Sequence, residues 1–103
     1  MKTQFLNDIM SVVSDVCEIP SELIISKCKT NDVVDARCMF VHFCQKYGFP
    51  SAAIMKYLGR RRNCTINRYL SCYEDFRKSS ASFRLFSSEI AKRLAAKYPS
   101  KES

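Results

Sequence analysis

Apolar residues recur with helical spacing along almost the whole sequence, and residues that interrupt helices are scarce. Only two glycines and three prolines occur in 103 residues. Near the N-terminus, Phe5, Ile9, Val12 and Val16 follow the spacing of one helix face. No segment shows the alternation of apolar and polar residues that predicts a half-buried strand. We therefore expect an all-α protein, a compact bundle of about six helices.

The residues that begin and end helices predict where these elements meet. Pro20 suits the first turn of a short helix, and Asn31 is expected to cap the longer helix that follows. Gly48 and Gly59 are expected to end the third and fourth helices, because glycine readily adopts the left-handed conformation found after a helix. The serine-rich stretch 79–82 should separate the last two helices. The core positions expected in the third and last helices are Val34, Cys38, Val41, Cys44, Phe83, Phe86, Ile90 and Leu94.

The length fits a single domain that spans residues 1–103. Apolar residues make up 47% of the chain and charged residues 26%, a balance typical of globular proteins. No window reaches the roughly 18–20 uncharged apolar residues that cross a bilayer. The first residues lack the continuous apolar stretch of a secretory signal. We therefore expect a cytoplasmic protein without a membrane partner.

Charge is distributed unevenly along the chain, whose net charge is +7. The half up to residue 50 carries five basic residues against six acidic ones, whereas the half from residue 51 carries twelve against four. A nearly neutral half joined to a strongly basic half indicates one face that meets a polyanion. A merely solvated basic surface fits the charge alone equally well.

Six cysteines occur, at positions 17, 28, 38, 44, 64 and 72, but their spacing does not indicate a metal site. No C-x-x-C pair is present, and the single histidine, His42, cannot complete a Cys₂His₂ set. Disulfides are unfavourable in the cytoplasm. We expect reduced cysteines that act as small core residues, with no metal and no cofactor. His42 and the scattered carboxylates form no catalytic set, so we do not expect an enzyme.

Residues 50–77 have the layout of a helix-turn-helix. A short helix ends at Gly59, three arginines follow, and a longer helix resumes near Asn63. In such motifs the start of the second helix enters the major groove, where arginine reads guanine and asparagine reads adenine. Helix N-termini also attract phosphate. The residues expected at the DNA from this segment are Arg60, Arg61, Arg62, Asn63, Thr65, Asn67 and Arg68.

Residues 5–97 resemble the C-terminal, origin-binding domain of the bacterial chromosomal replication initiator DnaA. Three blocks carry the resemblance: residues 16–27, which end in Ser-Lys, residues 34–40, and residues 54–68. The resemblance implies that Arg61 and Thr65 contact DNA, that Arg37 supports the contact from the third helix, and that Lys27 and Lys29 reach phosphates or the adjacent minor groove. We therefore expect Arg37, together with Lys27 and Lys29, to hold phosphates or the neighbouring minor groove. It implies a bacterial or phage protein.

Several positions depart from the family motif. Arg60 replaces a glycine, Arg62 an aspartate, Asn63 a histidine and Cys64 a threonine. The resemblance therefore implies a DNA-facing surface without a particular target sequence. The phosphate-binding loop of an ATPase, G-x-x-x-x-G-K-[ST], is absent from the sequence, so a protein partner would supply any ATPase function.

The function predicted from the sequence is double-stranded DNA binding through this helix-turn-helix, in replication initiation or transcription control. The alternative is a protein-interaction module that keeps the fold and has lost specific DNA recognition. Binding of structured RNA is a third interpretation of the basic segment. The sequence does not predict the oligomeric state.

Overall fold

The computed structural model describes the backbone of residues 2–25, 30–59 and 63–97, and the side chains of residues 4–25, 30–59 and 67–97. In these ranges the chain forms six α-helices and no strand. The helices are α1 (Lys2–Cys17), α2 (Ser21–Ile25), α3 (Asn31–Lys46), α4 (Ser51–Leu58), α5 (Asn63–Ser79) and α6 (Ala81–Lys97). The expected all-α bundle is confirmed.

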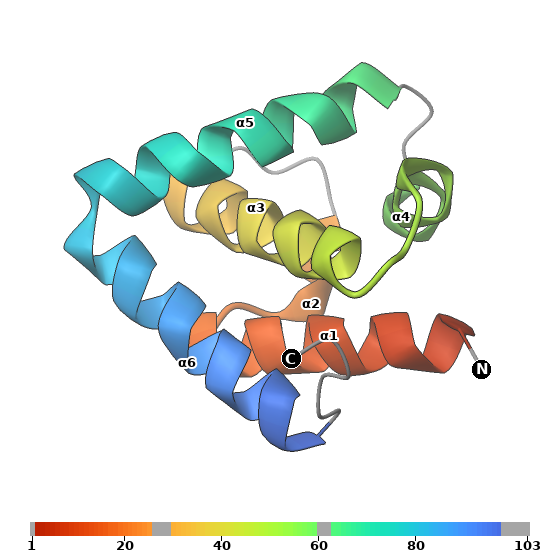
Figure 1. Cartoon of the computed structure of the whole chain (residues 1–103), viewed down its shortest axis with the longest axis horizontal. Coiled ribbons are helices and arrows are strands. Elements are labelled where there is room, and N and C mark those ends of the chain that lie inside the picture. Colours follow the sequence, from red (N-terminus) through yellow and green to blue (C-terminus); the bar gives the residue numbers. More distant parts are fainter. Residues whose placement is uncertain (1, 26–29, 60–62, 98–103) are drawn as a thin grey trace.

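Helix α3 is the centre of the bundle and packs against each of the other five helices. In Figure 1, α5 crosses one side of α3 and α1 the other, while α6 closes the end where α5 turns back. Met39, Phe40 and Val41 of α3 have no exposed surface. A helix with apolar residues on most of its faces is expected at such a position, because every face meets a neighbouring helix.

Glycine ends two helices where the sequence predicted it. Gly48 follows α3 with a φ of 95°, and Gly59 follows α4 with a φ of 72°. Both values lie in the left-handed region, which is costly for residues with a Cβ atom. The start of α3 differs from the prediction. Thr30 is the N-cap, although its side chain makes no capping hydrogen bond to the first turn, and Asn31 is the first helical residue.

The core of α6 differs from the prediction at one position. Phe83, Ile90 and Leu94 are buried as expected, but Phe86 is 41% exposed. Ser87 is buried in its place, and its hydroxyl is hydrogen-bonded to the hydroxyl of Tyr73 on α5. This bond gives the buried hydroxyl of Ser87 a hydrogen-bond partner. The face of α6 that packs on the core therefore includes residue 87 in place of residue 86. In α3, likewise, Val33 is buried and the predicted Val34 only half-buried.

The described cysteines behave as core residues. Cys38 and Cys44 are buried, Cys17 and Cys72 are half-buried against the core, and all four are free thiols. Burial raises the pKa of Cys38 to about 12 and that of Cys17 to about 11, in both cases with a smaller contribution from nearby acidic groups. No group of three or more His, Cys, Asp or Glu gathers within the described ranges. None of the described helices is long and apolar enough to cross a membrane.

Candidate nucleic-acid interface

Helices α4 and α5 are joined by residues 59–62 and cross at a steep angle. In Figure 1, α4 is seen nearly end-on while α5 runs across the view. Ile54 and Leu58 are buried and hold α4 against the core. The backbone N–H of Gly59 donates to the carbonyl of Lys56 at 3.2 Å, which closes the last turn of α4. Two helices joined at a steep angle by a short connector form the helix-turn-helix arrangement.

Helix α5 has an inner and an outer face. Tyr73 is buried, and Tyr69 and Leu70 are half-buried against the core. Asn67 and Arg68 are exposed on the outer face. This division follows from the helical repeat, since residues three or four apart share a face. The two polar side chains are therefore free to meet a ligand in solution.

The outer face changes charge along α5. Glu74 and Asp75 are exposed two turns beyond Asn67. Carboxylates at these positions repel phosphates, so the part of the outer face that suits a polyanion is the first half of the helix. On the neighbouring helix, Lys56 is exposed in the last turn of α4, close in sequence to the connector. The sequence-based prediction missed this lysine, although its place beside the connector indicated it.

The structure describes only part of the predicted set of DNA-contacting residues. Asn67 and Arg68 lie together on α5. Asn63 and Thr65 lie in the first turn of the same helix, with side chains outside the described residues. The predicted contacts that fall wholly outside the described residues are Lys27, Lys29, Arg60, Arg61 and Arg62.

Arg37 does not lie at the surface, so the direct phosphate or minor-groove contact implied for it is wrong. Its side chain is 2% exposed. Its guanidinium donates from Nε to the carbonyl of Ile24 at 2.7 Å, from Nη2 to the carbonyl of Leu23 at 3.4 Å, and from Nη1 to the hydroxyl of Tyr69 at 3.2 Å. The guanidinium carbon also lies 6.0 Å from the centre of the Tyr69 ring. A planar group with several fixed donors is suited to such a set of acceptors.

Arg37 is instead a buried tie between two elements. It connects a carbonyl in the last turn of α2 to the hydroxyl of Tyr69 on α5. The last carbonyls of a helix are commonly satisfied by such donors from outside it. The sequence held a signal for this burial. Residue 37 shares the spacing of Val33, Phe40 and Val41, which are all buried. The sequence-based prediction placed Arg37 at the surface because of its charge, although the helical spacing indicated a buried position.

Comparison with known proteins does not extend these observations. Neither the protein-family models nor the curated proteins include a match to this chain. The resemblance to the initiator domain therefore rests on the three sequence blocks alone.

Proposed function

We propose that this chain binds double-stranded DNA through α4, the basic connector and the first half of α5. The observation that carries the proposal is the outer face of α5. Exposed Asn67 and Arg68 follow a connector with three consecutive arginines, in a chain of net charge +7. The start of α5 would lie in the major groove and α4 would cross the backbone.

The tie made by Arg37 supports the same proposal in an indirect way. Leu23 and Ile24 immediately precede the segment that contains Lys27 and Lys29. Arg37 hydrogen-bonds both the carbonyls of these two residues and the hydroxyl of Tyr69, which follows Arg68 on α5. The segment that contains Lys27 and Lys29 follows α2, and Arg68 lies on α5. The buried side chain of Arg37 links these two helices.

The test is a titration of a fluorescently labelled random-sequence duplex, followed by anisotropy at several salt concentrations. Affinity should fall steeply with salt, because phosphate contacts release counterions. Arg61→Ala should weaken binding about tenfold, because the duplex would lose a charge-assisted contact. Arg68→Ala should reduce the salt slope by about one if the residue contacts a phosphate.

The matched control is Lys92→Ala, which removes one positive charge from an exposed position of α6. In Figure 1, α6 lies far from the start of α5. This variant should bind the duplex almost as the unchanged protein does. Equal weakening by Arg61→Ala and Lys92→Ala would mean that net charge alone attracts the duplex, and it would refute the placement of the site.

The second candidate is a protein-interaction module, and exposed apolar side chains on α6 favour it. Leu85 is 69% exposed and its neighbour Phe86 is 41% exposed. Exposed apolar patches often mark contacts with other proteins. The duplex titration discriminates, because such a module should show no salt-dependent affinity for random duplex even at low ionic strength. If the protein serves replication initiation, ATP hydrolysis would come from a separate partner.

A further inference from the structure

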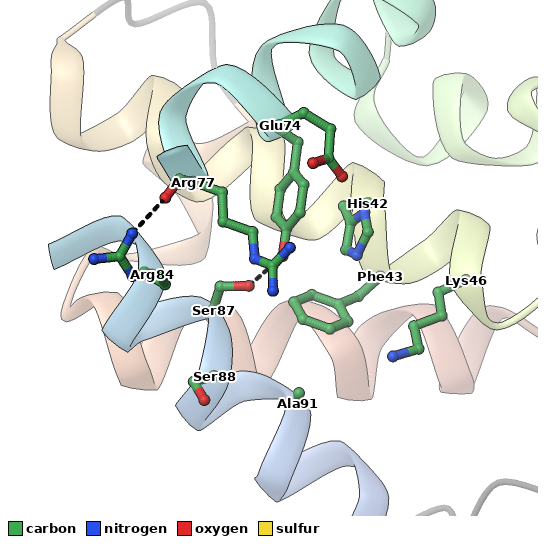
Figure 2. A pocket seen from close by; sticks show the side chains of 10 residues that line it. His42, Phe43, Lys46, Glu74, Arg77, Arg84, Ser87, Ser88 and Ala91 are labelled. Atoms are coloured by element: carbon green, nitrogen blue, oxygen red, sulfur yellow. Dashed lines mark hydrogen bonds between the residues drawn. The ribbon is translucent and has the colours of Figure 1, made fainter. Parts of the chain in front are cut away.

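A pocket of about 310 Å³ lies between α3, α5 and α6, beside the second half of α5 and not its first half. Figure 2 shows its walls, which come from the end of α3, the second half of α5 and the first two thirds of α6. Its volume lies at the lower end of the range of small-molecule sites, roughly 300–1,000 Å³. The lining residues that matter for its chemistry are His42, Lys46, Tyr73, Arg77, Ser87 and Ser88.

The charged groups at this pocket are mainly positive. Lys46, Arg77 and Arg84 come from three different helices, and Glu74 is the one carboxylate in the lining. In Figure 2, the guanidinium of Arg77 and the ammonium of Lys46 are directed toward the pocket. Arg84 turns away, and its Nη1 donates to the backbone carbonyl of Arg77 at 3.2 Å.

The two cations that face the pocket lack carboxylate partners. Within the described part of the chain, neither Arg77 nor Lys46 forms an ion pair, and Lys46 has only the Phe43 ring at 6.0 Å. By contrast, Arg93 on α6 is paired with carboxylates of α1 and α6. Two unpaired cations that share one concave site create a positive potential, which favours an anion.

The neutral part of the lining is held in place. The His42 ring stacks on Tyr73 with centroids 3.7 Å apart and planes 3° apart, and the Tyr73 hydroxyl is hydrogen-bonded to that of Ser87. Burial lowers the pKa of His42, and the positive charges of Lys46 and Arg77 lower it further against the opposing effect of Glu74. A neutral imidazole keeps one N–H donor. The exposed hydroxyl of Ser88 is a further donor at the rim.

We propose that this pocket binds a small phosphate-bearing molecule, with the phosphate between Arg77 and Lys46. The planar guanidinium can donate two parallel hydrogen bonds to phosphate oxygens, and the ammonium adds a compact charge from the opposite helix. Apolar surface at Phe43 and Ala91 bounds the rest of the ligand.

This site is separate from the proposed DNA-binding face. Arg77 follows Arg68 by nine residues, which places it about 13 Å further along α5 and about half a turn around the helix. The two arginines therefore point to opposite sides of the same helix. Occupation of the pocket does not depend on whether the start of α5 contacts DNA.

The experiment is a titration of the ¹⁵N-labelled full chain with inorganic pyrophosphate, followed by backbone amide shifts. We expect saturable shifts centred on residues 42–46, 73–77 and 84–91. The double variant Lys46→Gln/Arg77→Gln should weaken binding at least about tenfold, because each side chain donates a charge-assisted hydrogen bond. Both residues are exposed, so the substitutions spare the core.

The matched control is Lys78→Gln/Lys92→Gln, which removes the same net charge from exposed positions outside the pocket lining. This control should weaken pyrophosphate binding less than about threefold, because neither lysine lines the pocket and exposed charges outside it are partly screened. Shifts that do not saturate, or equal weakening by the two double variants, would overturn the proposal.

A second arm separates a free phosphate ligand from the phosphates of DNA. Both double variants are titrated into the random-sequence duplex at the same salt concentration. If the pocket serves a small ligand, the two variants should lose duplex affinity equally. A markedly larger loss for the pocket variant would make Lys46 and Arg77 contacts of the DNA backbone, and that result would also overturn the proposal.

Discussion

Replacement of Arg37 with methionine should lower the free energy of unfolding by about 3 kcal/mol. Two of the hydrogen bonds made by its guanidinium are well formed, at 2.7 Å to Ile24 and 3.2 Å to Tyr69, and the bond to Leu23 is long at 3.4 Å. Bonds to a charged group contribute about 1.5–3 kcal/mol each. The lower value applies, since removal of a buried charge also recovers part of its desolvation cost.

The measurement is urea unfolding followed by the helical circular-dichroism signal, together with thermal unfolding. For a chain of 103 residues, an unfolding entropy of about 2.1 cal/mol/K per residue converts the loss into a fall in Tm of about 14 °C. Arg93→Met is the control. Arg93 lies at the surface and forms ion pairs with Asp15 and Glu89, which contribute little in water.

The reasoning would be refuted by a destabilisation below about 1 kcal/mol, the size of an ordinary substitution. The assignment of Arg37 to the core would be contradicted most clearly if Arg37→Met remained stable and also bound duplex DNA more weakly than the Arg93→Met control. That combination would make Arg37 an exposed phosphate contact, as predicted from the sequence. A large loss of stability with duplex affinity preserved in the folded fraction is the expected outcome.

Three further predictions concern local conformation, pH and thiol chemistry. Gly59→Ala should destabilise the fold by about 1 kcal/mol in urea unfolding, because its φ of 72° is strained for alanine although the added Cβ meets no atom within 4 Å, whereas Gly59→Asn should lose less. His42→Phe should reduce the fall in the urea midpoint that occurs between pH 7 and pH 5. The pKa of His42 is lower in the folded protein than in the unfolded chain, so the unfolded chain binds the proton first and stability is lost as the pH falls. An unchanged pH profile in the variant would contradict this cause. Iodoacetamide at pH 8 should leave Cys38 and Cys44 unmodified until urea is added, because both thiols are buried and burial raises the pKa of each. Peptide mass mapping would detect labelling of these cysteines before urea is added, and such labelling would disprove their burial.

Glu18 offers a test of opposite sign to that of Gly59. It is a non-glycine residue with a positive φ, of 58°, immediately after α1. Glu18→Gly should therefore raise the free energy of unfolding by up to about 1 kcal/mol, because the left-handed conformation no longer strains a Cβ atom. Urea midpoints measured beside those of Gly59→Ala test both signs, and destabilisation by Glu18→Gly would argue against strain at this position.

The order and type of the helices could be predicted from the sequence because their causes are local. Apolar residues at helical spacing, a proline before α2 and the glycines after α3 and α4 act within a few residues of one another. The same local signals separated α5 from α6 at Ser80. For the candidate interface, they predicted the connector and the exposed outer face at Asn67 and Arg68.

What the sequence alone determined, then, is an all-α chain with a basic second half and a short connector between α4 and α5. Only the tertiary structure decided the role of Arg37, because its acceptors on α2 and α5 are 13 and 32 positions away in the chain. The exchange of Phe86 for Ser87 in the core depends in the same way on Tyr73 of another helix. The pocket between α3, α5 and α6 likewise exists only once three helices meet, since no local pattern joins Lys46 to Arg77. Periodicity fixes which face of a helix is apolar, but the partners that a polar side chain finds depend on how the helices pack.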